Sequence, residues 1–311
     1  MELRSPTDKD IQLGAVLPNR STDAAYRATL ERAVAQMSKS YGYWIESVYR
    51  RVLDEARKNG TINMAQDAKP KASGKNVNAL FVELKRLDDY WSDHFHALAW
   101  NTAQRVTKAW VRDNTVAWQA KLKRKGFAVK LQLTKQQKTL LQVKVRENVD
   151  LIKSIQKQYH TDIIGIVSRG FLGGRDLAAI SDAIKKRHSI TTRRAALIAR
   201  DQSNKATAQM NAARQTELGI QWALWIHSAG GKEPRRNHVR AGREYWIYDV
   251  RVGIDFGDNF GYVQPGEAIN CRCSSRSIIL SIGRGLPDGR KFDPAKLVPV
   301  DGFPGAYRMV A

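Results

Sequence analysis

The sequence predicts an α+β protein in which long N-terminal helices form a bundle, followed by a helix with a small antiparallel sheet and an extended C-terminal tail. Three observations lead to this fold class. Apolar residues recur at three- and four-residue steps through the first half of the chain, which is typical of amphipathic helices. After Gly219 the apolar pattern becomes strictly alternating, and beyond Gly283 frequent prolines and glycines exclude long regular elements.

An extended arm is expected at the start of the chain. Residues 1–22 lack clean periodicity and contain Pro6, Gly14 and Pro18. Arms of this kind often dock on a neighbouring subunit, so we expect this segment to lie against another protein.

Helical periodicity follows the arm, and Asp23 is the expected N-cap of the first helix. The second helix is much longer than an average helix, which leaves room for a break. A loop rich in glycine and polar residues is expected over 59–76. The helices predicted from periodicity cover residues 23–58, about 77–125 and 136–159.

The second half of the chain begins after a glycine cluster at residues 170–174. A short helix is expected over 175–187, and a further helix over 193–218 with Thr191 or Thr192 as its N-cap and Gly219 as its C-cap. Three strands follow, over residues 222–226, 245–252 and 272–280. In the first strand, alternation places Trp222, Leu224 and Ile226 on one side and Ala223 and Trp225 on the other.

These elements divide the chain into four expected parts. They are an arm (1–22), a basic helical domain (23–160), a mixed module (161–283) and an extended tail (284–311) that lies across a surface or a partner. With 311 residues, of which 42% are hydrophobic, the chain is long enough for a sizeable packed core.

The composition indicates a polyanion as the partner. The formal net charge is +22, from 52 Lys and Arg against 30 Asp and Glu, and nucleic acid is the leading candidate. No segment approaches the roughly 18–20 uncharged apolar residues of a membrane span, and the first residues lack the apolar core of a signal peptide. We therefore expect no membrane contact, and synthesis in the cytoplasm followed by retention there or packing into a particle assembled there.

Residues 105–157 are the most basic part of the chain. They hold 14 Lys and Arg against Asp113, Glu147 and Asp150. A solvated helix surface is the alternative, but the strong imbalance of sign, with Trp110 and Trp118 interleaved, favours DNA contact. The expected phosphate contacts from this region and from the later helix are Arg105, Lys108, Arg112, Lys121, Lys123, Arg124, Lys125, Lys130, Arg193, Arg194, Arg200 and Lys205.

The two cysteines raise the question of a metal. Cys271 and Cys273 are too close in sequence for an ordinary disulfide, and with His238 they are soft ligands suited to zinc. His227 is a candidate fourth ligand. Structural zinc sites more often use paired C-x-x-C motifs, so the favoured interpretation is that the cysteines fill a small core and His238 bonds to backbone across a turn. No metal or other cofactor is expected.

Catalysis is the weaker functional hypothesis. A nuclease would use His238 as general base with Asp255, Asp258 and Asn270 holding a metal near the phosphate. The two acids lie in a glycine-rich segment where turn formation explains them. A cysteine nucleophile lacks an identifiable base and oxyanion hole, and no phosphate-binding P-loop is present, so no catalytic residue is assigned.

The segment from Ala195 to Cys273 carries a recognisable series of residues. A basic helix precedes a Trp-rich strand, then a turn with a histidine, then a closing Asn-Cys-Arg-Cys. In this order it resembles the phage Mu F-like minor head proteins, the phage head morphogenesis family, over residues 161–283. The residues that match the family motif are Trp225, Arg235 (or its neighbour Arg236), His238, Gly242, Pro265, Gly266, Asn270, Cys271 and Cys273.

Two positions depart from the family pattern. Gly231 stands where the family tends to have Asp before the histidine, and the helix reads Ala-Arg-Asp-Gln-Ser-Asn over 199–204 where the family has an acidic residue in Ala-Arg-Thr-Glu-Thr-Asn. The resemblance therefore favours a structural motif over an acid-dependent reaction centre.

The resemblance implies a minor head protein of a tailed phage that associates with the portal and with other head proteins. Such a protein is carried in the virion, in the capsid interior or at the portal vertex, after assembly in the host cytoplasm. Several copies around the portal are compatible with this role. We expect residues 222–280 to dock on protein and the basic residues to contact double-stranded DNA without sequence preference. The alternatives are a metal-dependent nuclease delivered with the genome and a connector whose basic helices bind acidic protein.

Overall fold

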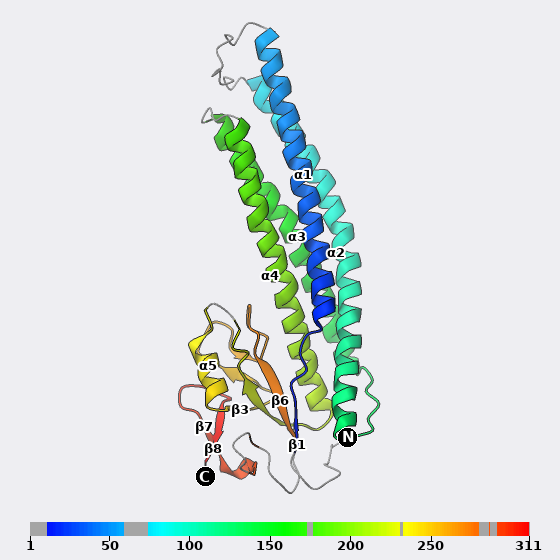
Figure 1. The fold of residues 1–311 in the computed structure, drawn as a ribbon, viewed down its shortest axis with the longest axis vertical. Coiled ribbons are helices and arrows are strands. Elements are labelled where there is room, and N and C mark those ends of the chain that lie inside the picture. The colour runs from blue at the N-terminus through cyan, green and yellow to red at the C-terminus, as the bar shows by residue number, and fades with distance from the viewer. Residues whose placement is uncertain are drawn as a thin grey trace. The chain divides into compact units, whose positions relative to one another are not determined.

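The computed structural model describes residues 11–58, 74–172, 177–230, 233–279, 286 and 291–310 (Figure 1). Its helices are α1 Arg20–Lys58, α2 Gly74–Arg124, α3 Lys135–Leu172, α4 Leu177–Glu217, α5 Arg236–Arg243 and the 3-10 helix η1 Pro294–Lys296. Its strands are β1 Ile11–Leu13, β2 Trp222–Ile226, β3 Ile247–Asp249, β4 Ile254–Asp255, β5 Tyr262–Val263, β6 Ser274–Ile279, β7 Leu297–Pro299 and β8 Tyr307–Met309. The α+β fold class is thereby confirmed.

The chain forms two compact units. The helical unit comprises residues 24–105 and 145–199, and the sheet unit comprises residues 1–23, 106–144 and 200–311. Both units are assembled from segments that are not contiguous in sequence, whereas the expected four-part division follows chain order.

The helical unit is held by apolar stripes on its four long helices. On α1 the buried positions recur at three- and four-residue steps, as predicted, and the same spacing recurs on α2 and α3. Charged faces alternate with these stripes, and none of the described helices is long and apolar enough to cross a membrane. Buried members of the α1 stripe are Tyr26, Leu30, Val34, Met37, Tyr41, Ile45, Val48 and Val52.

Two predicted helix boundaries are wrong. Helix α1 begins at Arg20, and Asn19 caps it, because the Asn19 side-chain oxygen accepts from the backbone N–H groups of Ser21 and Thr22. Helix α3 runs on to Leu172 instead of ending at residue 159, since Ile163 and Val167 continue its buried stripe.

The predicted helices 175–187 and 193–218 are one helix, α4. The residues between them include no glycine or proline, and β-branched residues lower helix propensity only slightly. Thr191 is buried inside α4 and is not a cap. The predicted end is confirmed, because Gly219 has a left-handed φ of 70° and its N–H bonds to the Thr216 carbonyl.

Six of the described strands form an antiparallel sheet in the order β1-β6-β2-β3-β8-β7, and β4 pairs with β5. In β2, which lies between β6 and β3, the alternation predicted from sequence is confirmed. Ala223 and Trp225 belong to a core cluster with Trp246 and Phe256, whereas Leu224 belongs to a second cluster with Trp222 and Ile226 at its edge. The sheet thus separates two cores.

Segments from the two ends of the described chain complete this sheet. In Figure 1 the blue strand β1 lies beside the orange strand β6, with Leu13 opposite Ser277. Residues 11–13 of the expected arm therefore dock on the sheet of their own chain, because Leu13 and Val16 enter an apolar cluster there. The expected tail is extended, and its strands β7 and β8 pair with each other and with β3.

Candidate functional site

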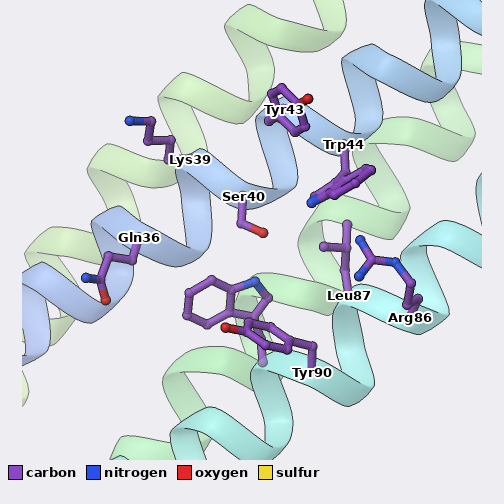
Figure 2. Close-up of a pocket in the computed structure, with 9 residues that line it drawn as sticks. Gln36, Lys39, Ser40, Tyr43, Trp44, Arg86, Leu87 and Tyr90 are labelled. Carbon is purple, nitrogen blue, oxygen red and sulfur yellow. The ribbon is translucent and has the colours of Figure 1, made fainter.

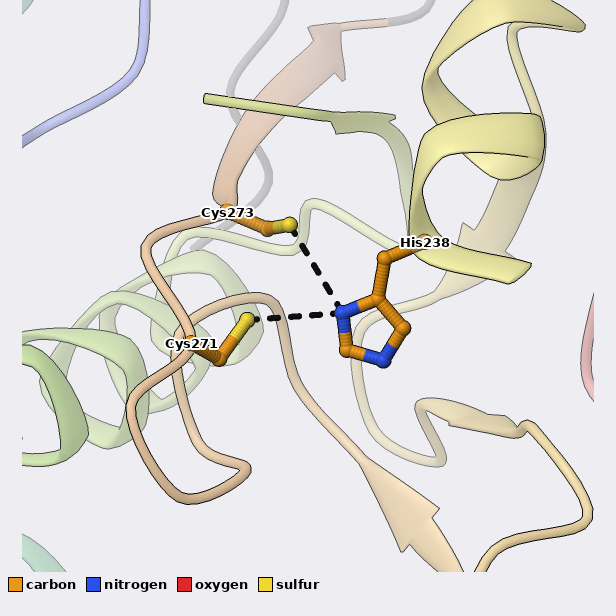
Figure 3. Close-up of side chains that lie close together, drawn as sticks. All are labelled: His238, Cys271 and Cys273. Carbon is orange, nitrogen blue, oxygen red and sulfur yellow. Dashed lines mark hydrogen bonds between the residues drawn. The ribbon is translucent and has the colours of Figure 1, made fainter. Parts of the chain in front are cut away.

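Three side chains from two separate segments meet in the core of the sheet unit (Figure 3). His238 lies on α5, and Cys271 and Cys273 lie just before β6. His238 Nδ1 is 3.5 Å from Cys271 Sγ and 3.7 Å from Cys273 Sγ. The exposed fractions are 2% for His238, 4% for Cys271 and 8% for Cys273, so the group is shielded from solvent.

A turn, rather than strand periodicity, places both thiols on one side. The sequence predicted a strand from residue 272, but β6 begins at Ser274. The backbone N–H of Cys271 donates to the Ala268 carbonyl at 2.9 Å, and Asn270 has a left-handed φ of 57°. Asparagine tolerates that conformation better than most residues, which accounts for its position before Cys271.

Aromatic rings surround the histidine. The His238 ring lies 4.3 Å from the Phe256 ring and 5.0 Å from the Trp225 ring, measured between centroids. Its Nδ1 faces the sulfurs, and its Nε2 has no hydrogen-bond partner among the described residues. The expected hydrogen bond from His238 to backbone across the turn is therefore wrong.

The two thiols differ in acidity because they share one hydrogen bond. The hydrogen bond from Cys273, together with His238, lowers the pKa of Cys271 against the opposing effect of burial. The same contact and burial raise the pKa of Cys273. A single thiolate beside one thiol and an imidazole is the arrangement that this geometry favours.

His227, the candidate fourth ligand, does not join the group. The described His, Cys, Asp and Glu residues form one cluster of metal-ligand type, and it contains His238, Cys271 and Cys273. His227 lies just after β2, where its Nδ1 accepts from the Ala229 N–H at 3.2 Å. Burial and the nearby His238 lower the pKa of His227.

Helix α4 holds the cysteine segment from one side. Asp201 accepts from the Asn270 backbone N–H at 2.6 Å, and Asn204 donates to the Cys271 carbonyl at 2.9 Å. The Arg200 guanidinium donates to the Asn270 side-chain oxygen at 2.9 Å. These bonds, which we call the α4 latch, fix the loop that carries the first cysteine.

Two glycines allow close approach of backbones around this group. A Cβ at Gly242 would lie 2.5 Å from the His227 Cβ and 2.9 Å from its backbone nitrogen, so α5 sits against the end of β2 only because residue 242 has no side chain. Gly266 has a left-handed φ of 97° and lies against α4 near Asn204 and Ala208. Arg235, before α5, donates to the Ile269 carbonyl at 3.0 Å.

The comparisons with known proteins found a family model that matches the region containing this group of residues. The model of the family described as phage Mu protein F like protein matches residues 161–276. This match supports the assignment of that region to the Mu F-like family. The family is a structural family of phage head proteins, which agrees with the resemblance read from the sequence.

A curated relative is also similar to part of this chain. An uncharacterized protein of Haemophilus influenzae (strain ATCC 51907 / DSM 11121 / KW20 / Rd) is 33% identical over 129 residues. The similar region covers 40% of this chain and 26% of that protein, so it spans about a quarter of the relative's length. No solved structure matches.

The geometry gives each motif residue of the Mu F-like region a place. Trp225 and His238 pack together, Gly242 and Gly266 permit close backbone contacts, and Asn270 begins the cysteine turn. Pro265 is buried next to Gly266. Gly231, where the family tends to have Asp, lies outside the described residues.

The residues predicted to contact DNA are spread over both units. In the sheet unit, Lys123, Arg124, Lys125 and Lys130 are exposed at the end of α2 and in the segment after it. Basic residues in a last helical turn also interact favourably with the helix dipole, which is the alternative reason for the first two. Others that are exposed are Arg105, Lys108, Arg112 and Arg193.

Several of the predicted contacts are engaged within the chain. Arg112 pairs with Asp113 at 2.8 Å and Lys205 with Asp201 at 2.9 Å. Arg194 donates to Ser154, and Arg200 belongs to the α4 latch. Burial, and then Arg124, lowers the pKa of the half-buried Lys121.

The tryptophans interleaved in the basic region are core residues. Trp110 and Trp118 are buried, and their ring N–H groups donate to Ser203 and Asn211. They are not available for stacking on bases.

The two aspartates that a nuclease would use to hold a metal accept hydrogen bonds within turns instead. Asp255 accepts from the Gly257 N–H at 2.9 Å and Asp258 from the Phe260 N–H at 3.2 Å. Neither joins the cluster around His238. The buried thiols also lack the access that a nucleophile requires.

An aromatic hollow of the helical unit was not predicted. It has a volume of about 460 Å³, lies between α1 and α2, and is lined by Gln36, Lys39, Ser40, Tyr43, Trp44, Arg86, Leu87, Tyr90 and Trp91 (Figure 2). The Arg86 guanidinium lies 4.6 Å from the Trp44 ring centroid. Trp44 and Trp91 lie at the three- and four-residue spacing of the predicted apolar positions, and sequence alone did not show that Trp44 is partly exposed whereas Trp91 is buried.

Proposed function

We propose that this protein is a minor head protein of a tailed bacteriophage and acts in head morphogenesis. The observation that carries the proposal is the Mu F-like region, matched over residues 161–276 and built around His238, Cys271 and Cys273. Its buried, locked arrangement suits a structural module rather than a reaction centre. The protein would reside in the virion, in the capsid interior or at the portal vertex.

The partners in this proposal are the portal and other head proteins. Residues 222–280, which include β2, α5 and β6, form the module that docks on protein, and several copies surround the portal. Cross-linking mass spectrometry of assembled heads tests this directly. We expect cross-links from lysines of this chain to the portal subunit, and cross-links only to proteins outside the portal vertex would contradict the assignment.

Nonspecific contact with packaged DNA is the second part of the proposal. The net charge of +22 and the exposed basic group Lys123, Arg124, Lys125 and Lys130 support it. A protein that neutralises phosphates releases counterions, so its affinity falls linearly with salt on logarithmic scales. The slope reports the number of phosphate contacts.

A charge-reversal variant makes this test specific. Replacing the four exposed basic residues with Glu should weaken double-stranded DNA binding on all sequences and reduce the salt slope by roughly one for each lost contact. The matched control reverses four other exposed cations, Arg50, Arg51, Lys185 and Lys186, and should retain the wild-type slope. A flat salt dependence in the wild-type protein would reject DNA contact and favour a connector that binds acidic protein.

A further inference from the structure

We propose that His238, Cys271 and Cys273 bind a zinc ion that fastens the cysteine turn to α5. The proposal goes beyond the role in head assembly and stands independently of it. It begins from the convergence of three donor atoms, all within 4.8 Å of one another, in a buried part of the sheet unit (Figure 3). The sequence had favoured core filling, because it could not show that the imidazole reaches both sulfurs.

The two nitrogen–sulfur distances have the values that a tetrahedral zinc site requires. With Zn–S near 2.3 Å and Zn–N near 2.0–2.1 Å, the edge between a sulfur and a nitrogen of the tetrahedron is about 3.6 Å. The observed separations from His238 Nδ1 are 3.5 Å to Cys271 Sγ and 3.7 Å to Cys273 Sγ. Both edges therefore accommodate one ion with little movement of the side chains.

The chemistry of the donors selects the metal. Two thiolates and one imidazole are soft and borderline ligands, which suit zinc and do not suit magnesium or calcium. The surroundings are apolar, with Trp225 and Phe256 against the imidazole. A thiolate buried among such rings is costly without a positive partner, and a zinc ion supplies that charge.

The site has three protein ligands, so a fourth, non-protein ligand such as water completes the tetrahedron. The ligands come from α5 and from the turn before β6, which are distant in sequence. A bound ion would link these segments in addition to the α4 latch. We assign the ion a structural role because its ligands are shielded from solvent and link two distant segments, and loss of the ion should loosen the turn.

Metal content is the primary test. We would purify the full chain without added chelator and measure zinc per chain by plasma mass spectrometry. About one zinc per chain is expected for the wild type and for His96→Ala, which removes an exposed imidazole on α2. Cys271→Ser, Cys273→Ser and His238→Ala should each lose most of the zinc. A wild-type protein that contains little zinc and takes up none from zinc-loaded buffer would overturn the proposal.

Two further measurements do not depend on variants that fold poorly. Cobalt substitution of the wild-type protein should give a thiolate-to-cobalt charge-transfer band with the intense visible bands of tetrahedral cobalt. Chelation should lower the Tm of the sheet unit, and added zinc should restore it. An octahedral cobalt spectrum would contradict a bound structural ion, as would a Tm that neither chelation nor added zinc changes.

Discussion

At position 242 the backbone of α5 passes so close to β2 that any side chain would collide with it. Gly242→Ala should destabilise the protein by about 1–3 kcal/mol, because the added methyl group meets the Cβ and backbone nitrogen of His227. Urea unfolding monitored by tryptophan fluorescence measures the change. Gly230→Ala, in an exposed loop of the same unit with ordinary contacts, should stay within about 0.5 kcal/mol of wild type.

The α4 latch gives a second prediction at the scale of single residues. Asp201→Ala removes the acceptor for the Asn270 N–H and should cost about 1–3 kcal/mol. Lys205→Met removes only the ion pair with Asp201 and should cost under about 1 kcal/mol. Hydrogen exchange at Asn270 and Cys271 should accelerate in the first variant alone. Equal effects of the two variants would show that the ion pair, and not the backbone bond, is what matters.

Between elements, a buried arginine ties α4 to α2 and to the segment after it. Arg214 is 1% exposed and donates to the Gln132 carbonyl, to Thr115 and to Glu217. Glu217→Ala should destabilise by about 3 kcal/mol, because it leaves a buried cation without its counter-charge. Arg214→Met should cost less, since it removes the charge as well. A larger loss for Arg214→Met in the same denaturant titration would contradict this assignment.

The helices of the helical unit share a polar group that makes stability depend on pH. His160 on α3 contacts the Tyr41 hydroxyl on α1 at 2.9 Å and Asp88 on α2 at 3.5 Å. Burial lowers the pKa of His160 against the opposing effect of Asp88. As the pH falls, His160 is therefore protonated in the unfolded state before it is protonated in the folded state. The contribution of neutral His160 to the free energy of unfolding is complete above about pH 6.5 and is lost as the pH falls from there toward the folded-state pKa.

Denaturant unfolding at about pH 8 and about pH 5.5 checks this sign. The wild-type protein should lose stability at the acidic pH, and His160→Gln should lose less. Asp88→Asn should lose more, because it removes the carboxylate that raises the pKa of His160. A variant at residue 160 with the full wild-type pH dependence would reject the assignment.

The elements also show which features a sequence reveals. Periodicity predicted the α1 stripe and the two faces of β2, because apolar residue type and burial coincide at these positions. The split of α4 was wrong because Thr191 is a plausible cap by type and becomes helical only through burial in its unit. The meeting of His238 with the cysteines was suggested by residue type, but its distances follow from a turn at Asn270 that spacing does not encode. The pairing of β1 with β6 joins distant segments and left no local signal.

For the whole molecule, the family match and the net positive charge both support the proposed place in a phage head. Residues 161–276 match the model of the phage Mu F-like family, and the excess of basic residues, 52 against 30 acidic residues, suits the proposed place near packaged DNA. The burial of His238, Cys271 and Cys273 and the turn hydrogen bonds of Asp255 and Asp258 support the proposed role in assembly. Its contacts with the portal and DNA are the proposals that particle biochemistry can test.

The most direct measurement is the copy number of this chain in purified virions and in DNA-free heads, by mass spectrometry normalised to the portal subunit. We predict that the chain is present in both particles at a low, fixed ratio to the portal, because a head morphogenesis protein joins the head before DNA enters. Its absence from both particles would contradict the assignment to the phage head.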